Sequence, residues 1–320
     1  MERREAMKIL LALGANHDPH FCQRRELDSL PNSDVVIQYW LAMARSPIFK
    51  RHVGSEQLHR RLTVAKNVDV NLEGLINLPS LFFSIIGQRI SVQRLILQTL
   101  SWAGRLVHEP TPLVMMFGGP SGHGKTELAE EYAKVLKAPF FKVDCSQMQT
   151  PTEIFGLGGA YQGADRGSAL NNFICDHSGR TSVVLLDELD KAQPEVWESF
   201  CNIFSRGEST DKKLGAENQS SLADCSKVIW VFTTNAFDDD ISRFWSEPEN
   251  DCSIGSEDFE AKAVALSYKL EDQIRPKLAS HHSETLASNV RTSWIARWLF
   301  SPMSCCRRNS TCSPTLRRTR

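Results

Sequence analysis

The residues best suited to chemistry form a glycine-rich segment that fits the pattern G-x-x-x-x-G-K-[ST]. Its members are Gly119, Pro120, Ser121, Gly122, His123, Gly124, Lys125 and Thr126. Between a strand and a helix, such a segment directs backbone N–H groups and the positive end of the helix dipole at one spot, where phosphate oxygens bind. We expect Lys125 to reach the β- and γ-phosphates of a nucleotide and the Thr126 hydroxyl to ligate Mg²⁺. The alternative is a glycine-rich turn that matches by accident.

Two neighbouring acids, Asp187 and Glu188, end the apolar run that begins at Ser182. A run of this kind suits a strand buried on both faces of a parallel sheet, whose carboxyl end opens onto the ligand crevice. Asp187 is expected to hold Mg²⁺ through its water shell, and Glu188 to polarise the water that attacks the γ-phosphorus. The alternative is a core strand followed by an acidic helix start, which the helix dipole also favours.

A third candidate site residue, the polar Asn235, follows the apolar run 227–233. A carboxamide at a strand tip can donate to the γ-phosphate and accept from the attacking water. An ordinary turn residue explains Asn235 equally well on chemistry alone.

The elements that must position these residues alternate in type. Apolar runs predict strands at 113–117, 139–144, 182–188 and 227–233, and helical patterns are found near 88–104, 127–137, 168–176 and 194–205. This alternation predicts an α/β fold with a doubly wound parallel sheet. The polar residues 207–226 predict a surface loop or a weak hairpin.

Composition narrows the class of protein. The chain has 320 residues, of which 41% are hydrophobic, enough for a real core. Residues 280–320 contain seven Arg, no Lys and one Glu, a net charge of +6, whereas the rest has 30 basic and 37 acidic residues, a net charge of −7. Specific nucleic-acid binding is therefore not expected.

The compartment is predicted from the cysteines and the apolar runs. Nine cysteines without a C-x-x-C pair argue against a disulfide framework and favour a reducing compartment. No apolar run approaches membrane-spanning length, and the N-terminus is a poor targeting signal. We expect a cytoplasmic protein without a membrane partner, with a mitochondrial or other reducing compartment left open.

The two ends of the chain differ from its middle. Residues 1–77 are predicted to be helical, with one helix from Asn32 or Ser33 to about Ala44, and residues 5–16 are similar to part of an ankyrin repeat. A plain amphipathic helix explains 5–16 as well, because one partial repeat cannot bury its own face. Residues 282–320 have no sustained periodicity and are predicted to form a disordered tail.

Several stretches together resemble the Clp-type AAA+ chaperone ATPases, the disaggregases and unfoldases. The stretches are 85–88, which resembles the segment that embraces adenine and includes Ile86; 117–129, the phosphate loop; 185–196, the acidic strand and the helix start beyond it; and Thr234-Asn235, the first sensor. The resemblance covers about 78–281, which we expect to be an AAA+ large domain of the P-loop NTPase fold. It implies ATP and Mg²⁺ as ligands, hydrolysis of ATP, a homo-hexamer and unfolded polypeptide substrates.

Tyr161 lies in Gly159-Ala160-Tyr161-Gln162-Gly163, which resembles the pore loop of that family. A ring of such aromatics would grip an extended chain without reading its sequence, and the glycines would supply hinge freedom. The alternative is a loop tyrosine in a glycine-rich turn.

The sequence departs from the family at its end. The segment 274–281 resembles the one that ends in the arginine finger, but the finger position is His281. A mostly neutral imidazole cannot replace a bidentate guanidinium, and such arginines contribute about three to five orders of magnitude in rate. Beyond His281 we find neither a fifth strand beside the phosphate-loop strand, nor a helical lid, nor a second sensor. A truncation, a shifted reading frame or a mis-joined exon would produce this change.

The leading hypothesis is an AAA+ ATPase that couples hydrolysis to polypeptide remodelling. The second is a truncated, hydrolysis-deficient nucleotide-binding module that acts as an adaptor or is a non-functional remnant. A helicase or clamp loader acting on DNA is a third, disfavoured by the acidic core.

Overall fold

A computed structural model of the chain describes most of its middle. The described residues are 43–44, 47–68, 72–85, 88–156, 168–210, 222–247, 259–281 and 291–294. The ankyrin-like stretch 5–16 therefore lies outside them. Of the helix predicted to end at about Ala44, only residues 43 and 44 are described, and both are helical.

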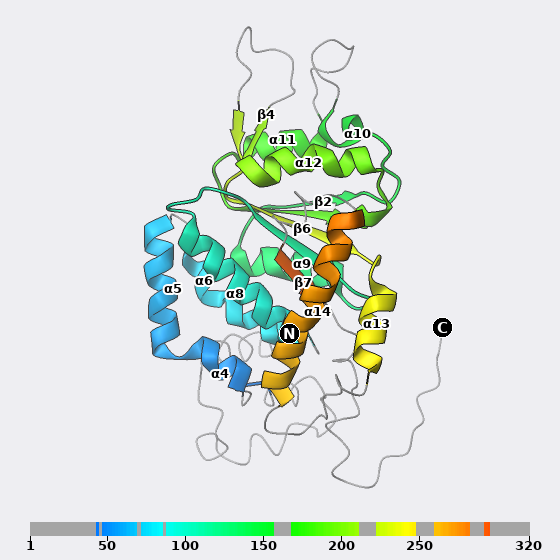
Figure 1. Cartoon of the computed structure of the whole chain (residues 1–320). Helices are drawn as coiled ribbons and strands as arrows, with labels where there is room; N and C mark the ends of the chain where they lie inside the picture. The colour runs from blue at the N-terminus through cyan, green and yellow to red at the C-terminus, as the bar shows by residue number, and fades with distance from the viewer. Residues whose placement is uncertain are drawn as a thin grey trace, which may run out of the picture.

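The centre of the fold is a parallel sheet of five strands (Figure 1). Its order is β2-β3-β6-β1-β7, and the strands are β1 (Leu113–Gly118), β2 (Phe140–Asp144), β3 (Ser182–Asp187), β6 (Val228–Thr234) and β7 (Arg291–Trp294). The three inner strands β1, β3 and β6 are buried along nearly their whole length, which is why their sequences are continuous apolar runs. The α/β class predicted from the sequence is confirmed.

The described residues also form helices, some of which cover the two faces of this sheet. They are α4 (Pro47–Val53), α5 (Ser55–Val68), α6 (Leu72–Asn77), α7 (Leu81–Ser84), α8 (Arg89–Arg105), α9 (Lys125–Leu136), α10 (Pro151–Phe155), α11 (Ala169–Asp176), α12 (Pro194–Arg206), α13 (Asp238–Ser246) and α14 (Phe259–His281), with 3₁₀ turns at Leu78–Ser80 and Leu189–Lys191. In Figure 1, α11 and α12 lie above the sheet, and α8 and α9 lie below it. The helices predicted near 88–104, 127–137, 168–176 and 194–205 are confirmed.

The predicted absence of a fifth strand is wrong. Strand β7 pairs in parallel with β1, with Met115 opposite Arg291 and Gly118 opposite Trp294. The prediction of a disordered tail over 282–320 is therefore wrong for residues 291–294, which form this strand. An edge strand of four residues needs no continuous apolar run, because one of its sides meets no neighbouring strand, so its sequence carries little signal.

The polar stretch 207–226 contains the weak hairpin that was one of its two predicted forms. Strands β4 (Glu208–Thr210) and β5 (Leu222–Asp224) pair antiparallel, and residues 211–221 between them lie outside the described part.

The hydrophobic core continues across residue 77, where the sequence predicted a domain boundary. Phe49 on α4 packs edge-on against the rings of Phe82 and Phe83, which belong to α7. Gly74 on α6 lies so close to α9 that a Cβ atom there would be 2.7 Å from the Leu136 carbonyl oxygen. A glycine at this position therefore allows helices on the two sides of residue 77 to touch.

A buried ion pair joins α8 to α14. Arg94 donates a hydrogen bond to Glu271, and these side chains are 5% and 9% exposed. Arg94 also donates to the Ser267 carbonyl oxygen at 3.1 Å and lies over the Tyr268 ring at 4.4 Å. Arg275 donates to the other Glu271 oxygen at 2.6 Å. The pair therefore holds the helix that ends at His281 against the body of the domain.

Replacing Glu271 with Met should lower the free energy of unfolding by about 3–5 kcal/mol, because the Arg94 guanidinium would stay buried without its carboxylate. Chemical denaturation monitored by circular dichroism would measure the loss. The double variant Arg94→Met/Glu271→Met should recover most of it, since it leaves no buried charge. A double variant as unstable as the single one would contradict this account.

Candidate active site

The glycine-rich loop lies between β1 and α9, at the carboxyl edge of the sheet. Gly124 is the residue before α9 and has a φ of 82°, a left-handed conformation that glycine adopts without steric cost. This conformation turns the chain into the helix, so that its first N–H groups face the loop. The loop is exposed at Ser121 and Gly122, while Lys125 is only 9% exposed.

The Lys125 ammonium group is surrounded by oxygen acceptors. It donates to the carbonyl oxygens of Gly119 and Pro120, the second at 2.9 Å, and to Asn235 Oδ1 at 2.6 Å. The loop and the tip of β6, 110 residues apart in the chain, therefore meet at one nitrogen atom.

Burial lowers the pKa of Lys125, and nearby carboxylates, led by Asp238 and Asp190, offset only part of that effect. Burial also raises the pKa of both Asp190 and Asp238. Because the Lys125 ammonium group is poorly solvated, a negatively charged ligand replaces little water when it approaches that group, while the nearby acids offset part of its attraction.

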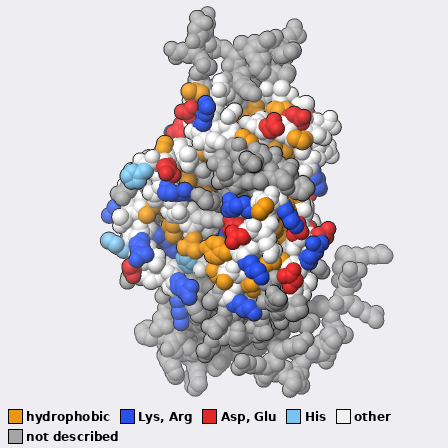
Figure 2. Space-filling view, in the orientation of Figure 1, with side chains coloured by type: hydrophobic (Ala, Val, Ile, Leu, Met, Phe, Trp, Pro, Cys, Tyr) orange, Lys and Arg blue, Asp and Glu red, His pale blue; other side chains and the backbone are white. Residues whose placement is uncertain are grey.

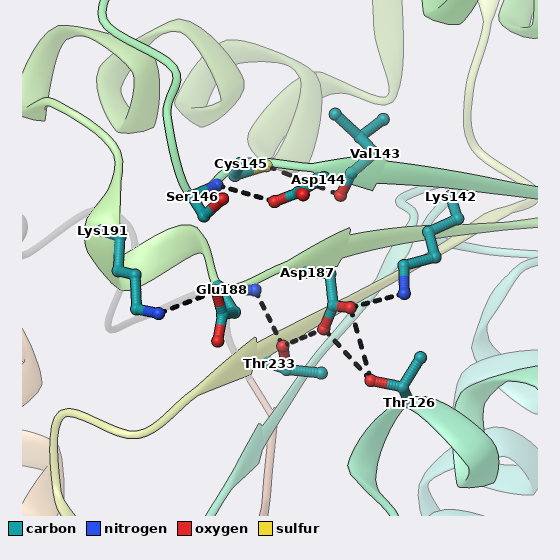
Figure 3. Close-up of polar contacts among 10 residues, drawn as sticks. All are labelled: Thr126, Lys142, Val143, Asp144, Cys145, Ser146, Asp187, Glu188, Lys191 and Thr233. Atoms are coloured by element: carbon teal, nitrogen blue, oxygen red, sulfur yellow. Dashed lines mark hydrogen bonds and ion pairs between the residues drawn. The ribbon is translucent and has the colours of Figure 1, made fainter. Parts of the chain in front are cut away.

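Asp187 accepts hydrogen bonds from three side chains at the tip of β3 (Figure 3). Thr233 Oγ1 donates to Oδ1 at 2.6 Å, Thr126 Oγ1 lies 3.2 Å from the same oxygen, and Lys142 Nζ is 2.7 Å from Oδ2. Burial raises the pKa of Asp187, but the hydrogen bonds from Lys142 and Thr233 outweigh it and leave the pKa below its ordinary value. Asp187 is therefore an ionised carboxylate held in one orientation.

Glu188 has a left-handed backbone, with a φ of 55°. This conformation costs a non-glycine residue on the order of 1–2 kcal/mol. The Glu188 N–H donates to Thr233 Oγ1 at 2.9 Å, and the carboxylate pairs with Lys191 at 2.8 Å (Figure 3). Thr233 thus links the backbone of Glu188 to the carboxylate of Asp187. Strain at the end of a buried strand is typical of a functional position.

The chemistry of these groups fits a nucleotide phosphate with Mg²⁺. The loop offers N–H groups and an ammonium group to phosphate oxygens. Thr126 and Asp187 offer a hydroxyl and a carboxylate oxygen side by side, the hard ligands that Mg²⁺ prefers.

The structure also locates some of the other predicted site residues. The ring of His123 faces the Ser121 carbonyl oxygen, and the His123 carbonyl oxygen accepts from Gln88, which begins the segment leading to α8. Ile86 and Tyr161 lie outside the described residues. His281 is the last residue of α14.

Sequence reasoning missed four side chains around this site: Lys142, Thr233, Asp190 and Asp238. Thr233 directly precedes the predicted Thr234-Asn235 tip, so its position in the strand was a usable signal. Lys142 lies 45 residues before Asp187, and nothing local in the sequence indicates that the two side chains meet.

A family model described as "AAA domain (Cdc48 subfamily)" matches residues 112–281, more than half of the chain. The protein named mitochondrial disaggregase in Homo sapiens is 30% identical over 192 residues, which are 54% of this chain and 26% of that protein. A ClpA homolog protein of Fuscovulum blasticum is 32% identical over 123 residues, which are 38% of this chain and 14% of that protein. The chain thus spans about a quarter of the length of the disaggregase.

A solved structure described as the closed state of Hsp104 with ATPγS and FITC-casein has a similar fold. Its TM-score is 0.53 at 20% sequence identity, and the match covers 90% of this chain and 48% of that one. At this identity the likeness is one of fold alone.

Proposed function

Because the chain belongs to the AAA domain family, Cdc48 subfamily, we propose that it binds Mg²⁺-ATP, hydrolyses it, and uses the energy to unfold or remodel polypeptides. The observation that carries this proposal is the meeting of Lys125, Asn235, Thr126, Asp187 and Glu188 at the carboxyl edge of one sheet. Lys125 and Asn235 are the proposed phosphate-binding and sensing residues, Thr126 and Asp187 the proposed metal ligands, and Glu188 the proposed base.

Each residue has a separate task in this mechanism. Lys125 binds the β- and γ-phosphates, and Asn235, which accepts a hydrogen bond from Lys125, orients the attacking water. Thr126 and Asp187 would hold Mg²⁺, which would supply positive charge to the phosphates. Glu188 accepts the proton of the attacking water.

Polypeptide is the proposed substrate because the relatives at 30% identity are named disaggregases. We propose a homo-hexamer in which Tyr161 contacts the substrate. Nucleic acid is disfavoured, since Figure 2 shows basic and acidic side chains interspersed on this face rather than gathered into one basic surface.

The proposed cellular compartment depends on the cysteines and on the name of the relatives. Cys145 and Cys225 are buried free cysteines, which fits a reducing compartment. The relatives' name favours the mitochondrion over the cytoplasm. Among the described residues, no helix has both the length and the apolar character needed to cross a membrane.

The second candidate, a nucleotide-binding module without hydrolysis, is favoured by one observation. In the resemblance to the Clp-type family, the position of the arginine finger is held by His281. The missing fifth strand no longer supports this candidate, because β7 is present.

ATP turnover measured against protein concentration separates the two candidates, with Glu188→Gln as the blank. We expect turnover per chain to rise cooperatively with concentration, because the ATP site of a ring is completed by a neighbouring subunit. ATP binding without turnover above the blank at any concentration would overturn the hydrolysis proposal and leave the binding module.

A further inference from the structure

Lys142 lies on an edge strand, where lysines commonly extend into water. Its side chain instead crosses to the neighbouring strand. Lys142 is opposite Leu185 in the ladder between β2 and β3, so Asp187 lies two residues further on the same face. A diagonal pair of this kind is within reach of a long side chain. The ammonium group ends 2.7 Å from Asp187 Oδ2, with Lys142 still 40% exposed.

The carboxylate of Asp187 has few acceptor positions left. Two hydroxyl groups approach Oδ1, one from Thr233 at 2.6 Å and one from Thr126 at 3.2 Å, while Oδ2 faces the ammonium group of Lys142. Figure 3 shows these three donors around the carboxylate on different sides. A carboxylate has about four lone-pair sites, so most of them are in use before any ligand arrives.

The positive charge of Lys142 weakens the attraction between Asp187 and a divalent cation. An ammonium group in contact with Asp187 cancels one negative charge and repels Mg²⁺ at short range. Within the described residues, no cluster of three or more His, Cys, Asp or Glu side chains could hold a metal by itself. The phosphates of a nucleotide would supply the missing negative charge, as they do at other Mg²⁺ sites that have one or two carboxylates.

We propose that Lys142 is a positioning residue that acts as the resident counter-ion of Asp187, and that it makes Mg²⁺ binding dependent on the nucleotide. It holds the carboxylate in place in the nucleotide-free chain and weakens binding of Mg²⁺ alone. This inference rests on the proposed function, since it assigns Asp187 to the metal.

The experiment is a Mg²⁺ titration of the nucleotide-free full chain, read as the shift of the thermal unfolding midpoint at constant ionic strength. The shift converts into a dissociation constant, because a ligand that binds only the folded state stabilises it by RT ln(1 + L/Kd), where L is the concentration of free ligand. The Lys142→Met variant should bind Mg²⁺ about tenfold tighter than the unsubstituted chain, about 1.4 kcal/mol. Comparing each variant with and without Mg²⁺ removes any change in its basal stability.

Two control variants make the result specific. Lys142→Arg keeps the charge and should bind Mg²⁺ as weakly as the unsubstituted chain. Lys134→Met removes the same charge from α9, where Lys134 is 66% exposed and pairs with Glu131, and should change nothing. Unchanged or weaker binding in Lys142→Met, or equal tightening in Lys134→Met, would overturn the proposal. Binding of a fluorescent ADP analogue is measured separately: its absence would refute the nucleotide site but leave the Mg²⁺ comparison valid.

Discussion

The Lys125→Ala variant should lose nucleotide binding by more than a hundredfold, about 2.8 kcal/mol. The ammonium group donates three hydrogen bonds to the loop carbonyls and Asn235, so it is held where phosphate oxygens would arrive. A hydrogen bond that involves a charged group contributes about 1.5–3 kcal/mol, and the variant can donate none to the phosphate oxygens. Burial, which lowers the pKa of Lys125, also means that water solvates its charge poorly.

Fluorescence titration with an ATP analogue would measure this loss. Lys134→Ala is the matched control, because it removes the same group from the exposed side of the same helix. An affinity of Lys125→Ala equal to that of the control would remove Lys125 from the phosphate site. Chemical denaturation of both variants would show whether a lost affinity comes from a lost fold.

The Glu188→Gln variant should bind ATP with nearly unchanged affinity and lose turnover by about 10²–10⁴-fold, the usual contribution of a general base. Glutamine has the same shape but cannot accept the proton from the attacking water. The backbone bond from the Glu188 N–H to Thr233 does not involve the substituted side chain, so the left-handed conformation should persist.

Stability should change little in this variant. The ion pair between Glu188 and Lys191 is partly exposed, and pairs of that kind contribute about 0–1 kcal/mol. Glu195→Gln, on an exposed position of α12, is the control for the charge change. Turnover retained in Glu188→Gln would remove Glu188 from the role of base.

The parts of the site predicted from the sequence are those whose signal is local. The loop 119–126 is contiguous, and the strands that carry Asp187 and Asn235 are apolar along their length because both faces are buried. The strand β7 was missed for the opposite reason, since an edge strand of four residues can be polar and still complete its backbone hydrogen bonds. Tyr161 and Ile86 stay predictions, as both lie outside the described residues.

The sequence by itself determined the α/β class, the glycine-rich loop, and the acids at the end of β3, because those properties follow from residue type and spacing within one element. Only the tertiary structure decided that Lys142 forms an ion pair with Asp187 and that Asn235 accepts a hydrogen bond from Lys125. The same is true of Thr233, whose hydroxyl connects Asp187 to the strained backbone of Glu188. Each of these contacts joins different strands or loops. Strand order and register place them, and neither is encoded in any single stretch of the chain.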